Sequence, residues 1–573
     1  MRTPRAVFLT CAIAAVVTGA VLAAVRLWVC DDAFISFRYA DNLVRGHGLV
    51  FNLGERVEGF TNLAWTLWAA LGLRLGFAAE TWAGVWGIAC FAATLALLAH
   101  RGWAIAQASA ASEAPGASGA PGAPAGLRAA AAVWPLPAAA LLGAIHHEWT
   151  VFATSGLETS AFTLLAFAGY LLVCPVGGPG ARAAPRRLAA AGLVLALASL
   201  TRPDGVVFAA VCGVWVLAGR DLRGALALAG GFAVLWLPVT IWRIAYYGDV
   251  FPNTYYAKSA AVAWWSQGAF YARIYFVRYW PLMLAVPCVL VRPRRAAALE
   301  LALAAAYAIY VIRVGGDFMF GRLLIPITPF LLLLVERGLG ALLGRRPVIA
   351  AAAIAGLGIA LVAMPPAVAG GHTRRGITDE NHVYTVAFPH WAERADTNGA
   401  ELARLFDGLP IAVGFFGLQA RLVYRSRVAT AIECETGLTD AAIAHQELPE
   451  RGRVGHEKHA KLPYLVARRV DFLLTRDWAN ELLRLDDQLP DVPIDLGRIG
   501  GRVITWDPAI MAALAARGVR VPDVPAQIDA YLAGIATRSD AEVRRDLERF
   551  RRLYFDRTPD PAREQPFRAR LGP

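Results

Sequence analysis

The chain has 573 residues, of which 57% are hydrophobic and 17% are charged, and its mean hydropathy is +0.46. These values exclude a globular enzyme with a single anchor and indicate a polytopic membrane protein with a soluble portion. The net charge of +12 does not predict nucleic-acid binding, because many arginines lie in short loops between apolar runs, where they set membrane topology. The seven cysteines show neither CxxC nor metal-ligand spacing, so no disulfide framework or zinc site is predicted.

Eleven apolar runs are predicted to cross a membrane. They lie near 6–27, 82–100, 129–146, 158–175, 187–201, 204–220, 224–242, 279–292, 296–312, 321–338 and 347–366. A further run, 62–79, contains Arg74. Whether it crosses the membrane determines on which side the arginine-bearing loops lie. If it does not cross, the arginine-bearing loops all fall on the side of the N-terminus, as the positive-inside rule requires. We therefore predict a cytoplasmic N-terminus in the inner (plasma) membrane, with 62–79 along the outer surface.

Residues 31–66 follow the first apolar run and carry adjacent carboxylates, Asp31 and Asp32, within a polar, glycine-punctuated stretch. Ionisable groups at a membrane boundary are costly unless water or a partner meets them, so they indicate a functional site. The alternative is a hydrated loop with solubilising charges. Four other polar motifs share the predicted outer face, although each alone is compatible with turn chemistry. They are HHEWTVFATSGLET (146–159), TRPDG (201–205), YYGDVFPNTYYAK (246–258) and GGDFMFGR (315–322).

The pattern becomes that of a soluble domain after residue 366. Strands are predicted at 411–417, 427–433, 470–475 and 500–506, and a charged amphipathic helix at 542–555. With eleven crossings, this tail is an extracytoplasmic α/β domain. We therefore expect two domains, 1–366 and 367–573. The stretch 104–126, rich in Ala, Gly, Pro and Ser, predicts a flexible cytoplasmic linker.

An outward cavity lined by acids and arginines suits chemistry on the water-soluble head of a lipid-linked substrate. Transfer of a sugar from a polyprenyl phosphate needs a carboxylate that takes the acceptor proton and cations that hold the departing phosphate. Asp31 and Asp32 are the candidate bases, and Asp32 is favoured because it lies one residue deeper in the external loop. The candidates for donor-phosphate or substrate binding are Arg322, Lys258, Arg202, Arg38, Asp317, Glu158, Arg243 and His456.

Two of these candidates have open alternatives. Lys258 stands out because the 56 basic residues include only three lysines, yet boundary cations also snorkel without binding a ligand. His456 and His459 lie at i and i+3 beside Glu457, a spacing that could suggest a metal. No third ligand is evident, so packing and polar surface compete with that interpretation. No cofactor is expected, and a divalent metal stays an alternative.

The acidic pair after the first span, the long first loop and the outer working face resemble membrane glycosyltransferases of the GT-C superfamily. That group includes protein mannosyltransferases and the lipid A aminoarabinose transferase. The sequence DDAFISFRYADNLVRGHGLVFNLGERVEGFTN most resembles the first loop of mycobacterial terminal arabinofuranosyltransferases. The resemblance covers roughly residues 1–340, and the tail of the aminoarabinose transferase is not matched.

This resemblance implies a polytopic α-helical fold whose first loop carries helices along the outer surface. It also implies inverting transfer of a sugar, such as arabinofuranose, from a polyprenyl-phosphate donor to an envelope glycan, lipid or protein acceptor. One residue of the acidic pair would serve as base. A transporter or flippase for lipid-linked saccharides is the alternative, as is an assembly factor. A transporter would be expected to show internal repeats and midplane charges, and neither is apparent.

Overall fold

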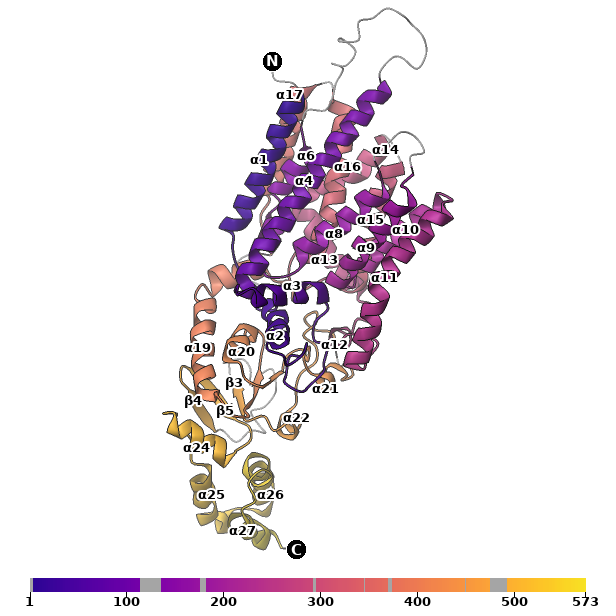
Figure 1. The fold of residues 1–573 in the computed structure, drawn as a ribbon. Coiled ribbons are helices and arrows are strands. Elements are labelled where there is room, and N and C mark those ends of the chain that lie inside the picture. The colour runs from indigo at the N-terminus through magenta and orange to yellow at the C-terminus, as the bar shows by residue number, and fades with distance from the viewer. Residues whose placement is uncertain are drawn as a thin grey trace, which may run out of the picture. The chain divides into compact units, whose positions relative to one another are not determined.

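A computed structural model describes residues 4–113, 136–175, 182–291, 295–344, 346–368, 374–448, 450–474 and 492–572 (Figure 1). The chain forms two compact units. Unit 1 comprises 1–33, 61–250 and 260–387, and unit 2 comprises 34–60, 251–259 and 388–573. This division differs from the expected boundary at 366/367. The change between units falls after residue 387, and two earlier loop segments belong to the same unit as the tail.

Unit 1 is a bundle of apolar helices that run side by side, with α1 against α4 and α9 against both α8 and α11 (Figure 1). Its long elements are α1 (Pro4–Val25), α4 (Ala79–Glu113), α8 (Thr159–Val173), α9 (Pro185–Thr201), α10 (Gly205–Ala218), α11 (Leu222–Tyr247), α13 (Trp265–Arg278), α15 (Arg295–Arg313), α16 (Thr328–Leu343) and α17 (Pro347–Ala363). Shorter elements are α3 (Leu63–Arg74), α6 (Ala138–Ala144), α7 (His147–Phe152), η1 (Trp280–Leu284), α14 (Ala285–Val291), η2 (Arg322–Ile327), α18 (Glu380–His382) and η3 (Val383–Ala387).

The apolar runs form helices as predicted. Each of the eleven coincides wholly or in part with a helix, and part of 129–146 lies outside the described residues. Within the described part, five helical segments are long and apolar enough to cross a membrane on length and composition alone, and four shorter apolar helices accompany them. The chain is therefore a polytopic membrane protein. The number of crossings and the side of each terminus stay predictions.

Two smaller expectations also meet the structure in unit 1. The run 62–79 contains a separate helix, α3, whose 12 residues extend only about 18 Å, too short to cross a bilayer. The linker prediction for 104–126 was wrong at its start, because α4 continues to Glu113. Alanine is the strongest helix former, and the AIAQASAASE sequence extends the helix despite its small side chains. Residues 114–126 lie outside the described residues.

Unit 2 contains a five-stranded sheet of order β2-β1-β3-β5-β4. The strands are β1 (Ala412–Phe415), β2 (Thr430–Glu433), β3 (Phe472–Leu474), β4 (Pro493–Leu496) and β5 (Ile499–Val503). The first three are parallel, and β3–β5 and β4–β5 are antiparallel. All four predicted strands are confirmed, whereas β4 was missed because its run is short and begins at a proline.

The helices of unit 2 include the predicted amphipathic one, which forms α26 (Asp540–Phe550) and the short π-helix η5 (Arg551–Phe555). The others are α2 (Ala33–Val44), α12 (Asn253–Ala257), α19 (Trp391–Phe406), α20 (Ala420–Ser426), α21 (Ala441–Ala444), α22 (Leu462–Ala467), α24 (Pro508–Ala516), α25 (Val524–Ala533), η4 (Ile535–Thr537) and α27 (Pro561–Leu571). An apolar core that includes Ile432, Cys434 and Leu473 lies under the sheet. The predicted α/β tail is therefore present.

Candidate active site

The acidic pair lies in a fixed turn between α1 and α2. The amide of Cys30 donates to the carbonyl oxygen of Ser155 at 2.9 Å, and the amide of Ala33 closes the turn on the carbonyl of Cys30 at 3.2 Å. Asp31 is 4% exposed, whereas Asp32 is half-buried. The two carboxylates thus have different surroundings, as neighbours on one backbone must, and Asp32 is the more accessible.

Arg322 lies where the GGDFMFGR turn enters η2. Its Nε donates to Oδ2 of Asp317 at 2.7 Å, and it interacts electrostatically with Asp32 and Glu158. Its two terminal nitrogens have no hydrogen-bond partner among the described residues. Gly321 precedes it with φ +78°, and a β-carbon there would lie 2.8 Å from the side chain of Glu148. Only glycine fits this turn, which directs a guanidinium with two unengaged donors into a charged cluster.

Arg202 lies in the same unit, but its donors are engaged. Its Nε and Nη2 bind both carboxylate oxygens of Asp204 at 3.0 and 2.8 Å, and its Nη1 lies 3.4 Å from Oε1 of Glu158. Asp204 also accepts the hydroxyl of Tyr307 at 2.6 Å, and Glu158 accepts the side-chain amide of Asn62 at 3.0 Å. These bonds make Arg202 a residue that joins α9, α10 and α8 to the site.

The N-terminal turn of α8 supplies further donors. Glu158 is its N-cap residue, and the hydroxyl oxygens of Thr159 and Ser160 are buried without a hydrogen-bond partner among the described residues. Because α8 packs against η2, these hydroxyls and Arg322 belong to one region of unit 1. A helix N-terminus favours negative charge, and buried hydroxyls without partners are costly unless a ligand or water meets them.

The cluster of unit 1 is defined by six of the predicted or newly found side chains. They are Asp32, Glu158, Arg202, Asp204, Asp317 and Arg322. Sequence reasoning missed Asp204, together with Tyr307 and Asn62, as partners in this network. The TRPDG motif was itself noted as unusual, and an acid two residues after Arg202 was an available signal.

Three other predicted phosphate or substrate contacts lie in unit 2. Lys258 is exposed and packs along Gly455, where a β-carbon would lie 3.5 Å from its Cγ. His456 follows Gly455 directly, and its Nδ1 donates to the carbonyl of Val454 at 3.1 Å. The fold thus brings Lys258 and His456 together from distant parts of the sequence.

Arg38 was predicted to contact the phosphate, but its donors bond to backbone carbonyls. It is 5% exposed, and its three nitrogens donate to the carbonyls of Phe51, Val423 and Val428 at 2.8, 3.0 and 2.6 Å. This arrangement is that of a residue that fixes the loop after α2 to the tail. Arg243, in unit 1, donates to the carbonyl of Val250 near the end of α11.

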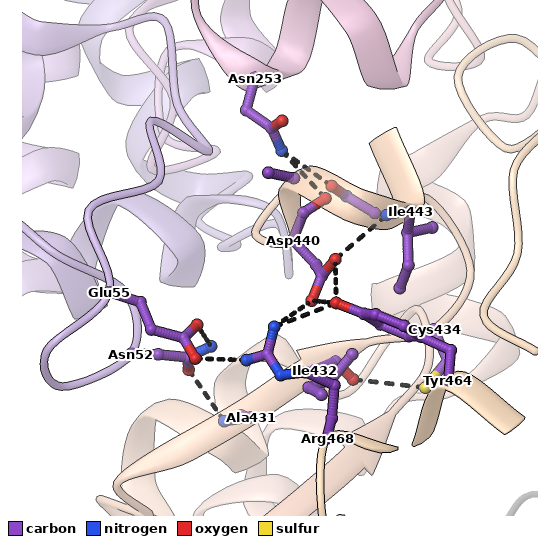
Figure 2. Close-up of polar contacts among 12 residues, drawn as sticks. Asn52, Glu55, Asn253, Ala431, Ile432, Cys434, Asp440, Ile443, Tyr464 and Arg468 are labelled. Carbon is purple, nitrogen blue, oxygen red and sulfur yellow. Dashed lines mark hydrogen bonds and ion pairs between the residues drawn. The ribbon is translucent and has the colours of Figure 1, made fainter. Parts of the chain in front are cut away.

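Figure 2 shows a second polar network, which lies wholly in unit 2. Arg468 binds Glu55 through Nη2 and Asp440 through Nη1, the latter at 3.0 Å. Tyr464 donates to the same carboxylate at 2.6–2.7 Å. The pairings were not predicted: Glu55 lies more than 400 positions from Arg468, and no local pattern indicates that Asp440 pairs with Arg468 and Tyr464. Among the described residues, no group of three or more His, Cys, Asp or Glu side chains is arranged to hold a metal ion.

Comparison with solved structures identifies the fold. ArnT from Cupriavidus metallidurans bound to undecaprenyl phosphate superposes with a TM-score of 0.52 at 15% identity, over 86% of this chain and 97% of that chain. Its apo form gives 0.50 over 85% and 96%. The chain has the GT-C fold. This structural match covers more of the chain than the resemblance in sequence, which was confined to roughly residues 1–340. Fold similarity persists where 15% identity leaves little trace in the sequence.

Two curated proteins resemble this chain in sequence. The terminal beta-(1->2)-arabinofuranosyltransferase of Mycobacterium tuberculosis is 32% identical over 360 residues, 55% of this chain and 52% of its own length. Its namesake from Corynebacterium glutamicum is 30% identical over 347 residues, 54% of this chain and 47% of its own. The chain thus spans about half the length of the curated relatives it matches. No protein-family model matches the chain.

Proposed function

We propose that this chain is an inverting glycosyltransferase that moves a sugar from a polyprenyl-phosphate donor to an envelope glycan, lipid or protein acceptor. The observation that carries the proposal is the pair of terminal nitrogens on Arg322, which have no hydrogen-bond partner within the described part of the chain, in a cluster that also contains Asp32. The arabinofuranosyltransferase relatives support glycosyl transfer, with arabinofuranose as the first sugar to test. The undecaprenyl phosphate bound by ArnT supports a lipid phosphate as the carrier.

The donor phosphate is assigned to Arg322 and the start of α8. A guanidinium with two parallel donors matches two phosphate oxygens, and the hydroxyls of Thr159 and Ser160 offer donors to a third. Asp317 holds Arg322 by Nε alone, so it orients the side chain without occupying the face that a phosphate needs. Arg202 contributes by holding Glu158 and Asp204 in place, and we assign it no phosphate contact.

Asp32 is assigned as the general base. In the transfer step the acceptor hydroxyl loses its proton to the Asp32 carboxylate as its oxygen forms a bond to the anomeric carbon. The bond from that carbon to the phosphate oxygen breaks, and the polyprenyl phosphate leaves with the electron pair. Attack from the face opposite the phosphate inverts the anomeric centre. Arg322 stabilises the negative charge that develops on the leaving phosphate, an effect realised most fully in the transition state.

The reaction is placed on the outer face of the inner membrane. The support is the arginine parity, which puts the N-terminus and the arginine-rich loops in the cytoplasm and the acidic pair outside. A reporter at the C-terminus that is active only outside the cytoplasm tests this directly. A cytoplasmic readout there would contradict both the eleven crossings and the location of the site.

Reconstituted transfer tests the function itself. The full chain is placed in lipid nanodiscs with polyprenyl-phosphate arabinofuranose, or another polyprenyl-phosphate sugar, and an arabinan oligosaccharide acceptor. We expect extension of the acceptor by one sugar with inverted anomeric configuration, read by mass spectrometry and NMR. In a parallel vesicle assay, movement of the labelled donor across the bilayer without transfer would instead support the transporter alternative and overturn the proposal.

A further inference from the structure

Unit 2 is assembled from three segments that are distant in sequence. The first loop, residues 34–60, and the second loop, residues 251–259, join the tail, which begins at residue 388. The first loop follows Asp32 almost directly, and the second contains Lys258. The contacts that hold these loops to the tail are specific, buried or half-buried polar bonds.

One side chain of the tail spans the distance to the first loop. Arg468 reaches Glu55 with one terminal nitrogen and Asp440 with the other, and its guanidinium lies between the two carboxylates in Figure 2. Asp440 is 1% exposed on its side chain, whereas Glu55 and Arg468 are 33% and 27% exposed. Asn52 supports the contact, because its amide donates to Glu55 at 3.1 Å and its oxygen accepts from Ala431 at 2.8 Å.

The same tail turn holds the second loop. The side-chain amide of Asn253 donates to the carbonyls of Gly437 and Leu438 at 3.0 and 2.8 Å, just before Asp440 (Figure 2). Its backbone amide donates to the carbonyl of Glu58 in the first loop at 3.0 Å. Lys458 adds a bond from its ammonium to the carbonyl of Tyr256 at 2.8 Å. Turn 437–440 is therefore the point at which all three segments meet.

Close packing fixes the register of the first loop at this turn. Gly59 donates its amide to the hydroxyl of Tyr39 at 2.8 Å. A β-carbon at Gly59 would lie 2.7 Å from the carbonyl oxygen of Leu438 and 2.8 Å from that hydroxyl. Neither neighbour is the end of a flexible aliphatic chain, so a larger residue must displace the loop from the tail.

We propose that Arg468, with Glu55 and Asp440, is a positioning device for sugar transfer, which we call the clasp. It holds the first loop, which begins two residues after Asp32 in the chain, against the tail. This inference rests on the proposed function. The link to the acidic pair is the chain itself, because α2 begins at Ala33, the residue after Asp32. Arg468 touches no reacting group and acts through the loop.

Hydrogen exchange on the full chain in nanodiscs tests the clasp without reference to activity. In Arg468→Gln we expect amides of residues 48–60 to exchange at least about tenfold faster than in the wild type, because the loop loses its charged anchor. Arg557→Gln is the matched control. Arg557 is also paired with a buried aspartate, Asp471, but both residues lie in the tail. Unchanged exchange at 48–60 in Arg468→Gln, or an equal rise in Arg557→Gln, would overturn the clasp.

Transfer kinetics then test what the clasp does. Arg468→Gln should lower kcat about tenfold while the Kd for polyprenyl phosphate, measured by fluorescence quenching, stays unchanged. Arg468→Lys should recover part of the rate, because a lysine retains the charge but reaches fewer oxygens. Arg557→Gln should retain wild-type kcat. Faster loop exchange with an unchanged kcat would show that the clasp serves the fold alone and would overturn its positioning role.

Substitution of Gly59 perturbs the same contact independently, and Gly534 provides the control. Gly59→Ala should reproduce both the faster exchange and the lower kcat, whereas Gly534→Ala in the tail has room for a methyl group and should change neither. A normal kcat in Gly59→Ala with a displaced loop would contradict the inference. If the wild type transfers no sugar from any donor, the proposed function fails, and exchange at 48–60 alone still decides whether the clasp exists.

Discussion

Two arginines in this chain, the buried Arg322 and the half-buried Arg468, have opposite hydrogen-bonding patterns. Arg322 in unit 1 uses Nε for Asp317 and leaves both terminal nitrogens without a partner among the described residues. Arg468 in unit 2 uses its terminal nitrogens for carboxylates on two different segments of the chain. An arginine whose donors are met by the protein stabilises structure, whereas one with open donors in a charged cluster is arranged for a ligand. Removing each should therefore have different consequences.

The largest expected effect lies at the acidic pair. Asp32→Asn keeps the side-chain shape while removing the base, so transfer should fall roughly 10²- to 10⁴-fold with normal membrane insertion. Asp31→Asn, at the more buried carboxylate, should affect insertion and yield more than the rate of the folded fraction. Single-turnover transfer by purified protein measures the rate, and size-exclusion chromatography reports folding. Near-normal transfer in both variants would remove the pair from the reaction.

Arg322 and Arg202 form the next comparison. Arg322→Gln should lower kcat/KM roughly 10²- to 10³-fold, since it removes donors that act on the leaving phosphate. Its unfolding temperature should fall less than that of Arg202→Gln, because only the one bond to Asp317 is lost. Arg202→Gln should show the reverse pattern, with a lower unfolding temperature, because three bonds to Asp204 and Glu158 are lost. Equal kinetic effects in the two variants would contradict the distinction drawn from their donors.

Arg38 extends the comparison to an arginine whose donors are all taken up by backbone carbonyls. Arg38→Met retains the length of the side chain but leaves three carbonyls without their donors, so unit 2 should lose about 3–5 kcal/mol of stability. Urea unfolding followed by tryptophan fluorescence of the full chain measures this loss. A stable variant that transfers more slowly because it binds the donor less tightly would restore Arg38 as a phosphate contact.

The smallest expected effect is a pH dependence of the stability of the tail. Burial, partly offset by hydrogen bonds, raises the pKa of Glu433 from its ordinary value of 4.5 to about 7. The folded state thus holds a proton that the unfolded state has released, and stability should fall as pH rises from 4.5 to 7. This loss amounts to at most about 3 kcal/mol. Unfolding of Glu433→Gln should show a shallower pH dependence than the wild type. Identical slopes would show that Glu433 does not titrate in this range.

The sequence by itself determined the elements that depend on local composition. Long apolar runs must become helices in a membrane because the lipid satisfies no backbone hydrogen bonds, and all eleven runs coincide wholly or partly with helices. Apolar and β-branched residues likewise predicted the strands at 411–417, 427–433, 470–475 and 500–506. The acidic pair could be singled out because two carboxylates directly after an apolar span are energetically costly unless water or a partner meets them.

Only the tertiary structure decided how the polar side chains are paired. From the sequence, Arg322 was the first of the arginine candidates for the phosphate and Arg202 the next, with Arg38 also included, because the hydrogen-bond partners of a guanidinium cannot be predicted from its position in the chain. In the folded protein, Arg38 bonds to three carbonyls and Arg202 to two carboxylates. Arg322 bonds to a single carboxylate. The boundary between units was also a tertiary outcome, since Glu55 meets Arg468 across more than 400 residues. Such pairings follow from long-range packing, which no local pattern encodes.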